Sequence, residues 1–226
     1  MRVFAIIPAY NEASRIGETV ERVRSRVDEV IVVDDGSNDG TAVVARGVGI
    51  RVLEHGLNRG QGAALRTGNE AALRLGADIV IHVDGDGQHD ADCIPRMIEP
   101  LRSGQADVVF GSRFLSEAPQ GMPLRRRLLL ILARLFNTFV MGIPRRVTDP
   151  QSGMRAMNVT ALQAADFRQD RMAHCSEILR LVTRSNLRWV EVPIRVSYSR
   201  ATLAKGQWQG GVVNIVWKLL IGVFTK

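Results

Sequence analysis

The sequence has few cysteines and no long uninterrupted hydrophobic run. Only two cysteines, Cys93 and Cys175, occur among its 226 residues. Two cysteines cannot form a disulfide framework in a chain of this length, so we expect ordinary thiols in a reducing compartment. No segment reaches the roughly 18 uncharged apolar residues that a membrane-spanning helix needs. The apolar run at 3–8 is too short for a signal peptide, and a cytoplasmic chain is therefore expected.

Acidic residues are missing from two stretches of the second half, 118–148 and 192–226. The net charge of +7 is therefore concentrated there. A basic half favours an anionic partner, which could be nucleic acid, lipid headgroups or a phosphorylated substrate. A solvated basic face without a dedicated partner is the alternative. The basic residues of the two stretches are Arg125, Arg126, Arg127, Arg134, Arg145, Arg146, Arg195, Arg200, Lys205, Lys218 and Lys226.

Strand-like and helix-like segments alternate through the first 110 residues. Unbroken apolar runs predict strands, and segments with helical periodicity lie between them, the first capped by Ser14 and ending near Arg26. This rhythm predicts an α/β fold with a mostly parallel, Rossmann-like sheet flanked by helices. The expected strands are 3–7, 30–33, 50–53, 78–83 and 108–110, and the later helices start near Thr41, cover 62–75 and pass through 94–101.

Polar clusters follow three of the expected strands, at 8–12, 34–41 and 84–90. Ligands of such sheets bind beyond the carboxyl ends of the strands, and we expect the functional site there.

Two apolar segments of the second half, 128–143 and 212–224, carry basic flanks or a narrow polar stripe. Such segments are typical of amphipathic helices that lie in a membrane interface. Burial against the domain or against a partner subunit is the alternative.

The fourth expected strand ends in Asp84-Gly85-Asp86-Gly87-Gln88. Residues two apart on an extended chain point the same way, so both carboxylates can face one ligand. Adjacent carboxylates repel unless a cation intervenes, and Mg²⁺ or Mn²⁺ prefers such oxygen ligands. Asp84, Asp86 and Gln88 are therefore the expected metal ligands. A calcium loop is disfavoured because its twelfth position, normally glutamate, is Pro95.

Two histidines flank this acidic cluster. His82 lies within the expected strand and is interpreted as a core histidine with its hydrogen bonds satisfied. His89 lies in the loop, where contact with a ligand is a weaker alternative.

Several blocks together resemble the family 2 glycosyltransferases, and among them the dolichyl- and polyprenyl-phosphate sugar transferases. The likeness runs from about residue 6 to 205. The blocks are 7–12 (IPAYNE), 32–41 (VVDDGSNDGT), 58–62 (NRGQG), 84–88 (DGDGQ), 111–114 (GSRF), 149–155 (DPQSGMR) and 192–194 (VPI).

The resemblance implies a GT-A fold and an inverting, metal-dependent transfer from a nucleoside diphosphate sugar. It implies that Asp35 accepts a hydrogen bond from the base, that Asp84 lies near ribose and metal, and that Asp86 and Gln88 hold the cation against the diphosphate. The residues expected to line the nucleoside pocket are Pro8, Tyr10, Glu12 and Asp35. Those expected to meet the acceptor phosphate or the diphosphate are Arg113, Arg155, Arg200 and Lys205.

The chemistry of the acceptor decides whether a base is needed. A lipid phosphate is already anionic, whereas a hydroxyl requires a carboxylate base. Glu177 lies where the family often keeps a glutamate and is expected to be either that base or a structural partner. Two departures from the lipid-phosphate pattern leave the acceptor open: Ala91 replaces a proline, and 200–205 lacks the glycine-x-serine-lysine run. This tail is more similar to small bacterial transferases of surface-polysaccharide assembly.

These expectations combine into one organisation. A catalytic domain, 1–205, holds a nucleotide-sugar half (1–115) and an acceptor half (116–205), and an amphipathic helix follows at 206–226. The acceptor is expected to be a polyprenyl phosphate or a polyprenyl-linked glycan, met peripherally at the inner face of the cell membrane. A homodimer is left open.

Two other classes of protein compete with this interpretation. A sugar nucleotidyltransferase would carry a glycine-rich basic loop after the first strand, where 8–12 reads Pro-Ala-Tyr-Asn-Glu. A nucleic-acid-binding module is disfavoured because aromatics make up only 5% and no zinc-finger or RNP-like block occurs.

Overall fold

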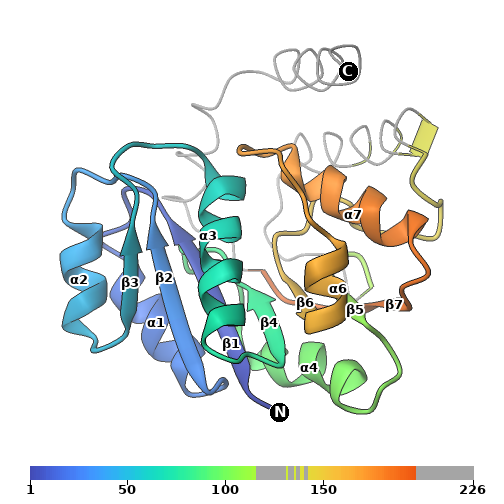
Figure 1. Ribbon diagram of the computed structural model, residues 1–226, viewed down its shortest axis with the longest axis horizontal. Coiled ribbons are helices and arrows are strands. Elements are labelled where there is room, and N and C mark those ends of the chain that lie inside the picture. The colour runs from blue at the N-terminus through green and yellow to red at the C-terminus, as the bar shows by residue number, and fades with distance from the viewer. Residues whose placement is uncertain (116–130, 132–134, 136–137, 140–141, 197–226) are drawn as a thin grey trace.

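A seven-stranded sheet forms the centre of the molecule (Figure 1). The computed structural model describes residues 1–115, 131, 135, 138–139 and 142–196. The strand order is β3-β2-β1-β4-β6-β5-β7, in which only β6 runs antiparallel to its neighbours. This confirms the predicted mostly parallel sheet. The strands are β1 (Val3–Ala9), β2 (Glu29–Asp34), β3 (Arg51–Glu54), β4 (Ile79–His82), β5 (Val108–Ser112), β6 (Arg155–Asn158) and β7 (Trp189–Pro193).

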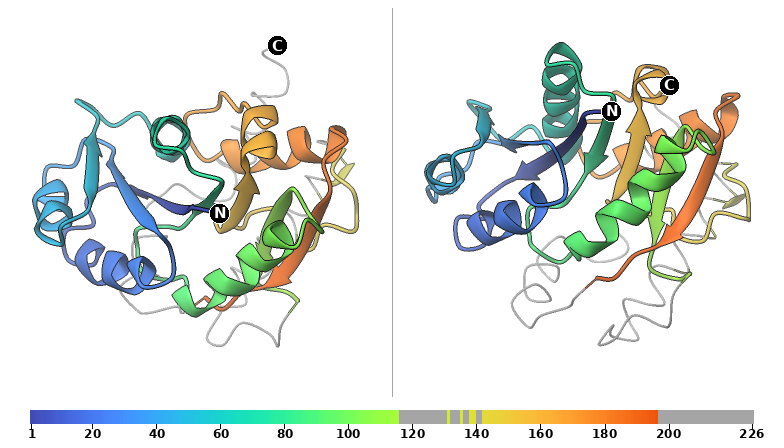
Figure 2. Two further views of the ribbon diagram at one scale, coloured as in Figure 1. Left: turned by 60° about the horizontal axis from the view of Figure 1, so that its bottom comes forward. Right: turned by 90° about the horizontal axis from the view of Figure 1, so that it is seen from below.

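Helices cover both faces of the sheet, as Figure 2 shows. One hydrophobic core joins α1, α2 and α4 to one face, and a second joins α3, α6 and α7 to the other. Along β1, Val3, Ala5 and Ile7 enter the first core, while Phe4 and Ile6 enter the second. The helices are α1 (Ile16–Arg24), α2 (Thr41–Gly47), α3 (Gln61–Arg74), α4 (Ile94–Arg102), which follows a 3₁₀ turn (Ala91–Cys93), α6 (Val159–Ala164) and α7 (His174–Arg184).

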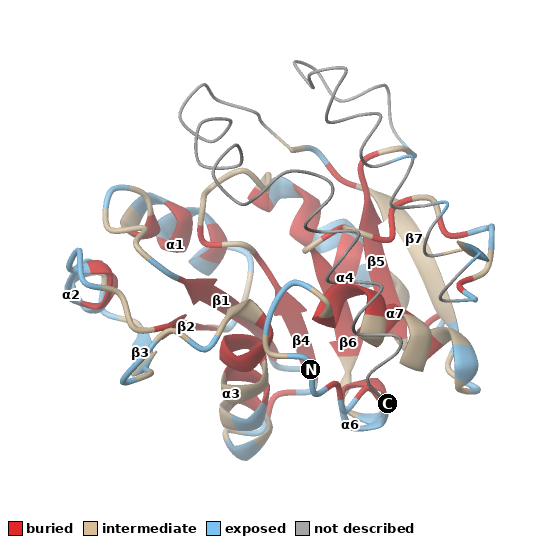
Figure 3. Ribbon diagram, turned by 90° about the horizontal axis from the view of Figure 1, so that it is seen from above, coloured by how far each residue is buried: buried red, intermediate tan, exposed pale blue. Residues whose placement is uncertain are grey.

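Burial on both faces explains the unbroken apolar runs of the sequence. Every residue of β1 is buried, and the central strands are buried throughout (Figure 3). The five predicted strands are confirmed, with their ends shifted by a few residues at most.

The predicted helix cap at Ser14 is wrong. Helix α1 begins at Ile16, with Arg15 at the N-cap position and no side-chain cap. The carbonyl of Glu12 instead accepts the backbone N–H groups of Arg15 and Ile16, both at 2.9 Å. A backbone turn thus satisfies donors that a capping side chain would otherwise take.

Strands β6 and β7 were not among the predicted strands. β6 inserts between β4 and β5, with Ile81 opposite Ala156 and Val109 opposite the same residue on the other side. The sheet therefore includes strands from both of the predicted halves, 1–115 and 116–205. The domain boundaries themselves stay predictions.

Several expectations fall outside the described residues. These include Arg200, Lys205, the amphipathic helix at 206–226 and most of the basic segment 128–143. Within the part of the chain that the structure does describe, no helix combines the length and the hydrophobicity needed to cross a bilayer.

Candidate active site

The polar clusters meet at one edge of the sheet, as expected. Strands β3, β2, β1 and β4 are adjacent and parallel, so their carboxyl ends lie together. Backbone hydrogen bonds continue this alignment just past the strand ends. The amide of Asp35 donates to the carbonyl of Ala9 at 2.8 Å, and the amide of His55 donates to the carbonyl of Asp34 at 2.9 Å. The loops that follow these strands therefore form one surface.

The loops after β1 and β2 are interlocked by side chains. The amide of Asn11 donates to Ser37 Oγ at 2.9 Å, and the amide of Glu12 donates to Thr41 Oγ1 at 2.9 Å. Asn11 adopts φ 54°, a left-handed conformation that asparagine tolerates better than most residues. This turn leaves the Tyr10 side chain 47% exposed at the strand tip.

The sequence placed Pro8, Tyr10 and Glu12 in a nucleoside pocket. Pro8 is buried at the end of β1, Tyr10 is exposed beside it, and Glu12 is half-buried with an ion pair to Arg15 at 3.2 Å. All three lie at the expected edge of the sheet, and their contacts with a nucleoside stay predictions.

Asp35 is buried, with 3% of its surface exposed, and three donors of the protein hold its carboxylate. His55 Nδ1 lies 2.7 Å from Oδ1, the amide of Arg59 donates to Oδ1 at 3.0 Å, and the amide of Gly60 donates to Oδ2 at 2.6 Å. A carboxylate offers about four acceptor positions, so about one is left for a ligand. The predicted hydrogen bond from a base is compatible with that remaining position.

Asp84 is held on three sides. Gln61 Nε2 donates to Oδ1 at 2.7 Å, and His89 Nε2 lies 3.6 Å from Oδ2. Gly153 packs so closely that a Cβ there would lie 2.5 Å from Oδ2. The 149–155 block therefore abuts the Asp84 carboxylate through a glycine, and any side chain there would displace that carboxylate. Gln61 and Gly153 were not predicted as site residues.

Asp86 lies in a turn rather than on extended chain. The alternation argument that led to the pair is therefore wrong, although the two side chains are near enough to repel. Burial, and next the charge of Asp84, raise the pKa of Asp86 above its ordinary value. Gln88 donates to Asp86 twice, from its amide N at 3.0 Å and from Nε2 at 2.5 Å.

The donor set fits an open Mg²⁺ or Mn²⁺ site. Two mutually repelling carboxylates attract a divalent cation, and a half-turn of the Gln88 carboxamide would present oxygen instead of nitrogen. Among the described residues, no group of three or more His, Cys, Asp or Glu side chains could hold a metal ion. Sites that rely on substrate phosphates need only one or two protein carboxylates, which Asp84 and Asp86 supply.

Arg113 forms a buried ion pair instead of standing open at the site. Its Nε lies 2.6 Å from Asp149 Oδ2 and its Nη2 lies 2.7 Å from Oδ1, with side chains 10% and 1% exposed. Glu191 accepts the backbone N–H groups of Thr148 and Asp149 nearby. The contact of Arg113 with a substrate phosphate stays a prediction.

Arg155 is 1% exposed and also bonds within the protein. Its Nη2 donates to Ser152 O at 3.0 Å and to Cys175 Sγ at 3.2 Å, and His174 Nε2 lies 3.4 Å from the same sulfur. The predicted phosphate contact of Arg155 is not tested, but its guanidinium is enclosed here. The residue type of Arg155 predicted an anionic partner. Within its hydrogen bonds, the group that can carry a negative charge is the sulfur of Cys175.

His82 belongs to the same buried region. His82 is 1% exposed and its Nε2 lies 2.8 Å from Asn69 Oδ1, which confirms a core histidine. The prediction that its hydrogen bonds are satisfied is wrong, because within the described residues its buried Nδ1 has no hydrogen-bond partner. Burial, then Arg155 and His174, lower its pKa well below the ordinary value. The ring is therefore neutral.

Cys175 is expected to make stability depend on pH. Burial raises the pKa of its thiol, but His174 and Arg155 together lower it to about 6, below the unfolded value. A depressed pKa contributes stability that is fully present above the unfolded value and is lost as pH falls through 6. Relative to Cys175→Ser, the wild-type free energy of unfolding should therefore rise by about 1 kcal/mol per pH unit between pH 6 and 8.5.

Urea unfolding of both proteins at four pH values measures this difference. Cys93 serves as the control, because burial raises rather than lowers the pKa of its thiol. Cys93→Ser should shift the free energy of unfolding by a constant amount over the same range. A constant difference for Cys175→Ser as well would show that Cys175 stays a thiol.

Glu177 acts as a structural partner. One carboxylate oxygen accepts the amides of Arg168 at 3.0 Å and Gln169 at 2.8 Å. This holds the loop before α7 against the start of α3, where a Cβ on Gly62 would lie 2.1 Å from Gln169 O. These contacts agree with the structural alternative for Glu177, and a role as base stays a prediction.

Acidic side chains at the tips of adjacent parallel strands are typical of enzymes that bind nucleotides with a divalent cation. Residues 4–164 match the model of Glycosyl transferase family 2, and the chain belongs to this family. It is therefore a member of a glycosyltransferase family.

Similar proteins share most of the chain. A UDP-N-acetylglucosamine–dolichyl-phosphate N-acetylglucosaminyltransferase of Methanococcus voltae is 34% identical, over 90% of this chain and 89% of its own. An undecaprenyl-phosphate mannosyltransferase of Micrococcus luteus is 32% identical, over 95% and 90%. The crystal structure of glucosyl-3-phosphoglycerate synthase from Mycobacterium tuberculosis superimposes with a TM-score of 0.72 at 22% identity, over 91% of this chain and 75% of that one. This confirms the GT-A fold.

Proposed function

We propose that this protein transfers a sugar, with inversion, from a nucleoside diphosphate sugar to the phosphate of a polyprenyl lipid. The observation that carries the proposal is the convergence of Asp35, Asp84 and Asp86 on one edge of the sheet. One aspartate can receive a base, and the pair can receive a diphosphate through a cation. Both curated relatives described above act, by name, on a lipid phosphate.

Each side chain has a role in this reaction. Asp35 accepts an N–H of the base at its remaining lone pair, beside Pro8, Tyr10 and Glu12. Asp84 and Asp86 hold Mg²⁺ or Mn²⁺, together with the oxygen of Gln88. Asp84, Asp86 and Gln88 would hold such a cation so that it could supply Lewis-acid stabilisation of the departing diphosphate. The solved relative from Mycobacterium tuberculosis was crystallised with Mn²⁺ and uridine diphosphate.

The acceptor phosphate attacks the anomeric carbon of the sugar. One of its oxygens forms the new bond to that carbon, the bond from the carbon to the β-phosphate oxygen breaks, and the nucleoside diphosphate leaves on the opposite side. A phosphate oxygen is already anionic and requires no base. The engagement of Glu177 with two backbone N–H groups favours this acceptor over a hydroxyl.

A direct assay tests the proposal. The purified protein is incubated with Mn²⁺, undecaprenyl phosphate in detergent micelles, and labelled UDP-N-acetylglucosamine, UDP-glucose or GDP-mannose. We expect label from one donor to enter the organic phase, with loss of this product in EDTA and an inverted anomeric configuration. Transfer only to a lipid-linked glycan would overturn the acceptor. Absence of transfer from every donor, together with formation of nucleotide sugar from sugar phosphate, would overturn the activity.

The same proposal includes peripheral contact with the inner face of the membrane. Ile131, Leu135 and Phe139 are helical, recur every four residues and are 46%, 48% and 68% exposed. Arg145 packs over the Phe139 ring at 5.5 Å, which places a cation beside this apolar stripe. Each basic residue near an anionic bilayer contributes about 1 kcal/mol. The homodimer stays a prediction.

Flotation with liposomes is expected to show this contact. The wild type should float with vesicles that contain phosphatidylglycerol at low salt, and Phe139→Glu should reduce the floating fraction several-fold. Val43→Glu is the matched control, because Val43 is 71% exposed on α2, outside the stripe. Failure of the wild type to float, or equal loss in both variants, would contradict membrane contact through this stripe.

A further inference from the structure

A buried chain of hydrogen bonds connects Asp35 to helix α3. His55 Nδ1 lies 2.7 Å from Asp35 Oδ1, and His55 Nε2 lies 2.9 Å from Thr67 Oγ1. The His55 side chain is 9% exposed and that of Asp35 is 4% exposed. These hydrogen bonds join three parts of the fold: Asp35 follows β2, His55 follows β3, and Thr67 lies in α3.

The partners of His55 decide the direction of these hydrogen bonds. An ionised carboxylate only accepts, so His55 Nδ1 carries hydrogen and donates to Asp35. The other ring nitrogen, Nε2, lies 2.9 Å from Thr67 Oγ1, and a hydroxyl can either donate or accept. The ring is therefore held at both nitrogens in one orientation.

We propose that His55 is a positioning residue that fixes the Asp35 carboxylate for recognition of a nucleobase N–H, with Thr67 holding the imidazole in place. This inference rests on the proposed function. With His55 and the Arg59 amide on Oδ1, and the Gly60 amide on Oδ2, the remaining lone pair belongs to Oδ2 and has a fixed direction. A base is then recognised by a donor aimed at that oxygen.

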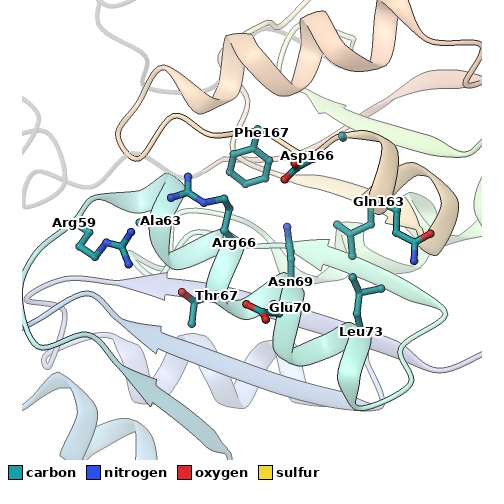
Figure 4. Close-up of a pocket in the computed structure, with 12 residues that line it drawn as sticks. Arg59, Ala63, Arg66, Thr67, Asn69, Glu70, Leu73, Gln163, Asp166 and Phe167 are labelled. Atoms are coloured by element: carbon teal, nitrogen blue, oxygen red, sulfur yellow. The ribbon is translucent and has the colours of Figure 1, made fainter.

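Helix α3 packs closely on the sheet, and this lets Thr67 hold the His55 ring in place. Thr67 lines a cavity of about 540 Å³ between α3 and the segment 162–167, and Figure 4 shows it on the α3 wall of that cavity. The helix itself is locked to the sheet, because a Cβ on Gly68 would lie 2.2 Å from Ile6. His55 is thus held from an element that cannot shift easily.

A matched pair of variants tests the role of His55. Asparagine places its amide N–H about where Nδ1–H lies and so keeps the donor, whereas leucine has a similar size and no donor. Binding of UDP, GDP and dTDP with Mg²⁺ is measured by calorimetry for the wild type, His55→Leu and His55→Asn. Inorganic pyrophosphate with Mg²⁺ is the probe that lacks a base.

For the nucleotide that the wild type binds, His55→Leu should weaken binding roughly 10- to 100-fold, as expected for a hydrogen bond to a charged group. Pyrophosphate binding should be unchanged within twofold, and His55→Asn should restore most of the nucleotide affinity. Equal nucleotide binding by His55→Leu and the wild type, or equal weakening of nucleotide and pyrophosphate, would overturn the inference alone. Failure of the wild type to bind any of the three nucleotides would overturn the proposed function as well.

Discussion

Replacing Asp86 with alanine is expected to abolish sugar transfer and the part of the thermal shift that depends on Mn²⁺. The variant removes one of two carboxylates available for a cation at this edge of the sheet. A divalent cation contributes several kcal/mol to stabilising a departing diphosphate, so kcat should fall about 10³-fold or more. Nucleoside diphosphate should still raise the melting temperature slightly, because Asp35 is untouched, but adding Mn²⁺ should raise it no further.

The stability of the metal-free protein separates this effect from misfolding. Burial and the charge of Asp84 both disfavour the ionised Asp86 carboxylate. Its removal therefore relieves repulsion, and Asp86→Ala without metal should melt no lower than the wild type. Asp78→Asn is the matched control, because Asp78 precedes the strand that Asp84 follows and forms an ion pair with the N-terminus in which both groups are 54% exposed.

Two outcomes would contradict the assignment of Asp86. The variant could keep a full Mn²⁺-dependent shift, in which case Asp86 is not a ligand. The control could lose the shift as well, in which case the effect is a general consequence of removing a carboxylate. The thermal shift caused by nucleotide without Mn²⁺ distinguishes loss of metal from loss of fold, since a folded variant without metal should still bind nucleotide.

Much of the fold follows from local pattern. β1, β2 and β4 are buried on both faces, and unbroken apolar runs such as 3–7 reveal them directly. β6 escaped prediction because it is four residues long, Arg-Ala-Met-Asn, and its first residue is a buried arginine. Its place in the sheet depends on tertiary pairing with β4 and β5, which no local pattern encodes.

Candidate site residues could be predicted where they lie close together in the sequence. Asp84 and Asp86 were found from strand, glycine and carboxylate spacing, even though the chain between them turns. His55 could have been found from the rule that functional side chains follow strand ends, because it lies two residues past the third predicted strand, 50–53, and directly after β3. Gly153 could not, since its contact with Asp84 joins residues 69 positions apart and depends on packing.

Arginines were the least predictable members of the site. Arg113 and Arg155 were expected to meet phosphates because the guanidinium fork suits them. The structure pairs one with Asp149 and places the other against Cys175, and their contacts with phosphates stay predictions. Residue type predicts that an arginine has an anionic partner, but only the fold decides which anion it meets.

The Arg113–Asp149 pair is expected to be a major determinant of stability. Asp149→Ala removes the carboxylate that receives both Nε and Nη2 of the buried Arg113 guanidinium. Breaking a buried pair in this way costs about 3–5 kcal/mol. For a chain of this size the melting temperature should fall by roughly 6–20 °C.

A surface pair provides the comparison. Arg188 also donates two side-chain hydrogen bonds to a carboxylate, that of Asp107, at 3.1 Å from Nε and 3.0 Å from Nη2. Its side chain, however, is 61% exposed. Solvent screens that pair, so Arg188→Ala should destabilise the protein much less than Asp149→Ala. Urea unfolding of both variants measures the contrast, and comparable losses would show that burial does not strengthen the Arg113 pair.

The double variant Arg113→Met with Asp149→Leu separates two origins of the loss. If Asp149→Ala is costly because it leaves a charge buried, removing both charges should recover most of the stability. The backbone near 149 stays anchored meanwhile, because Glu191 accepts its amide at 3.2 Å independently of the pair. A double variant as unstable as Asp149→Ala would instead show that the ion pair itself stabilises the fold. Recovered stability without recovered sugar transfer would show that the Arg113–Asp149 pair is needed for transfer beyond its effect on the fold.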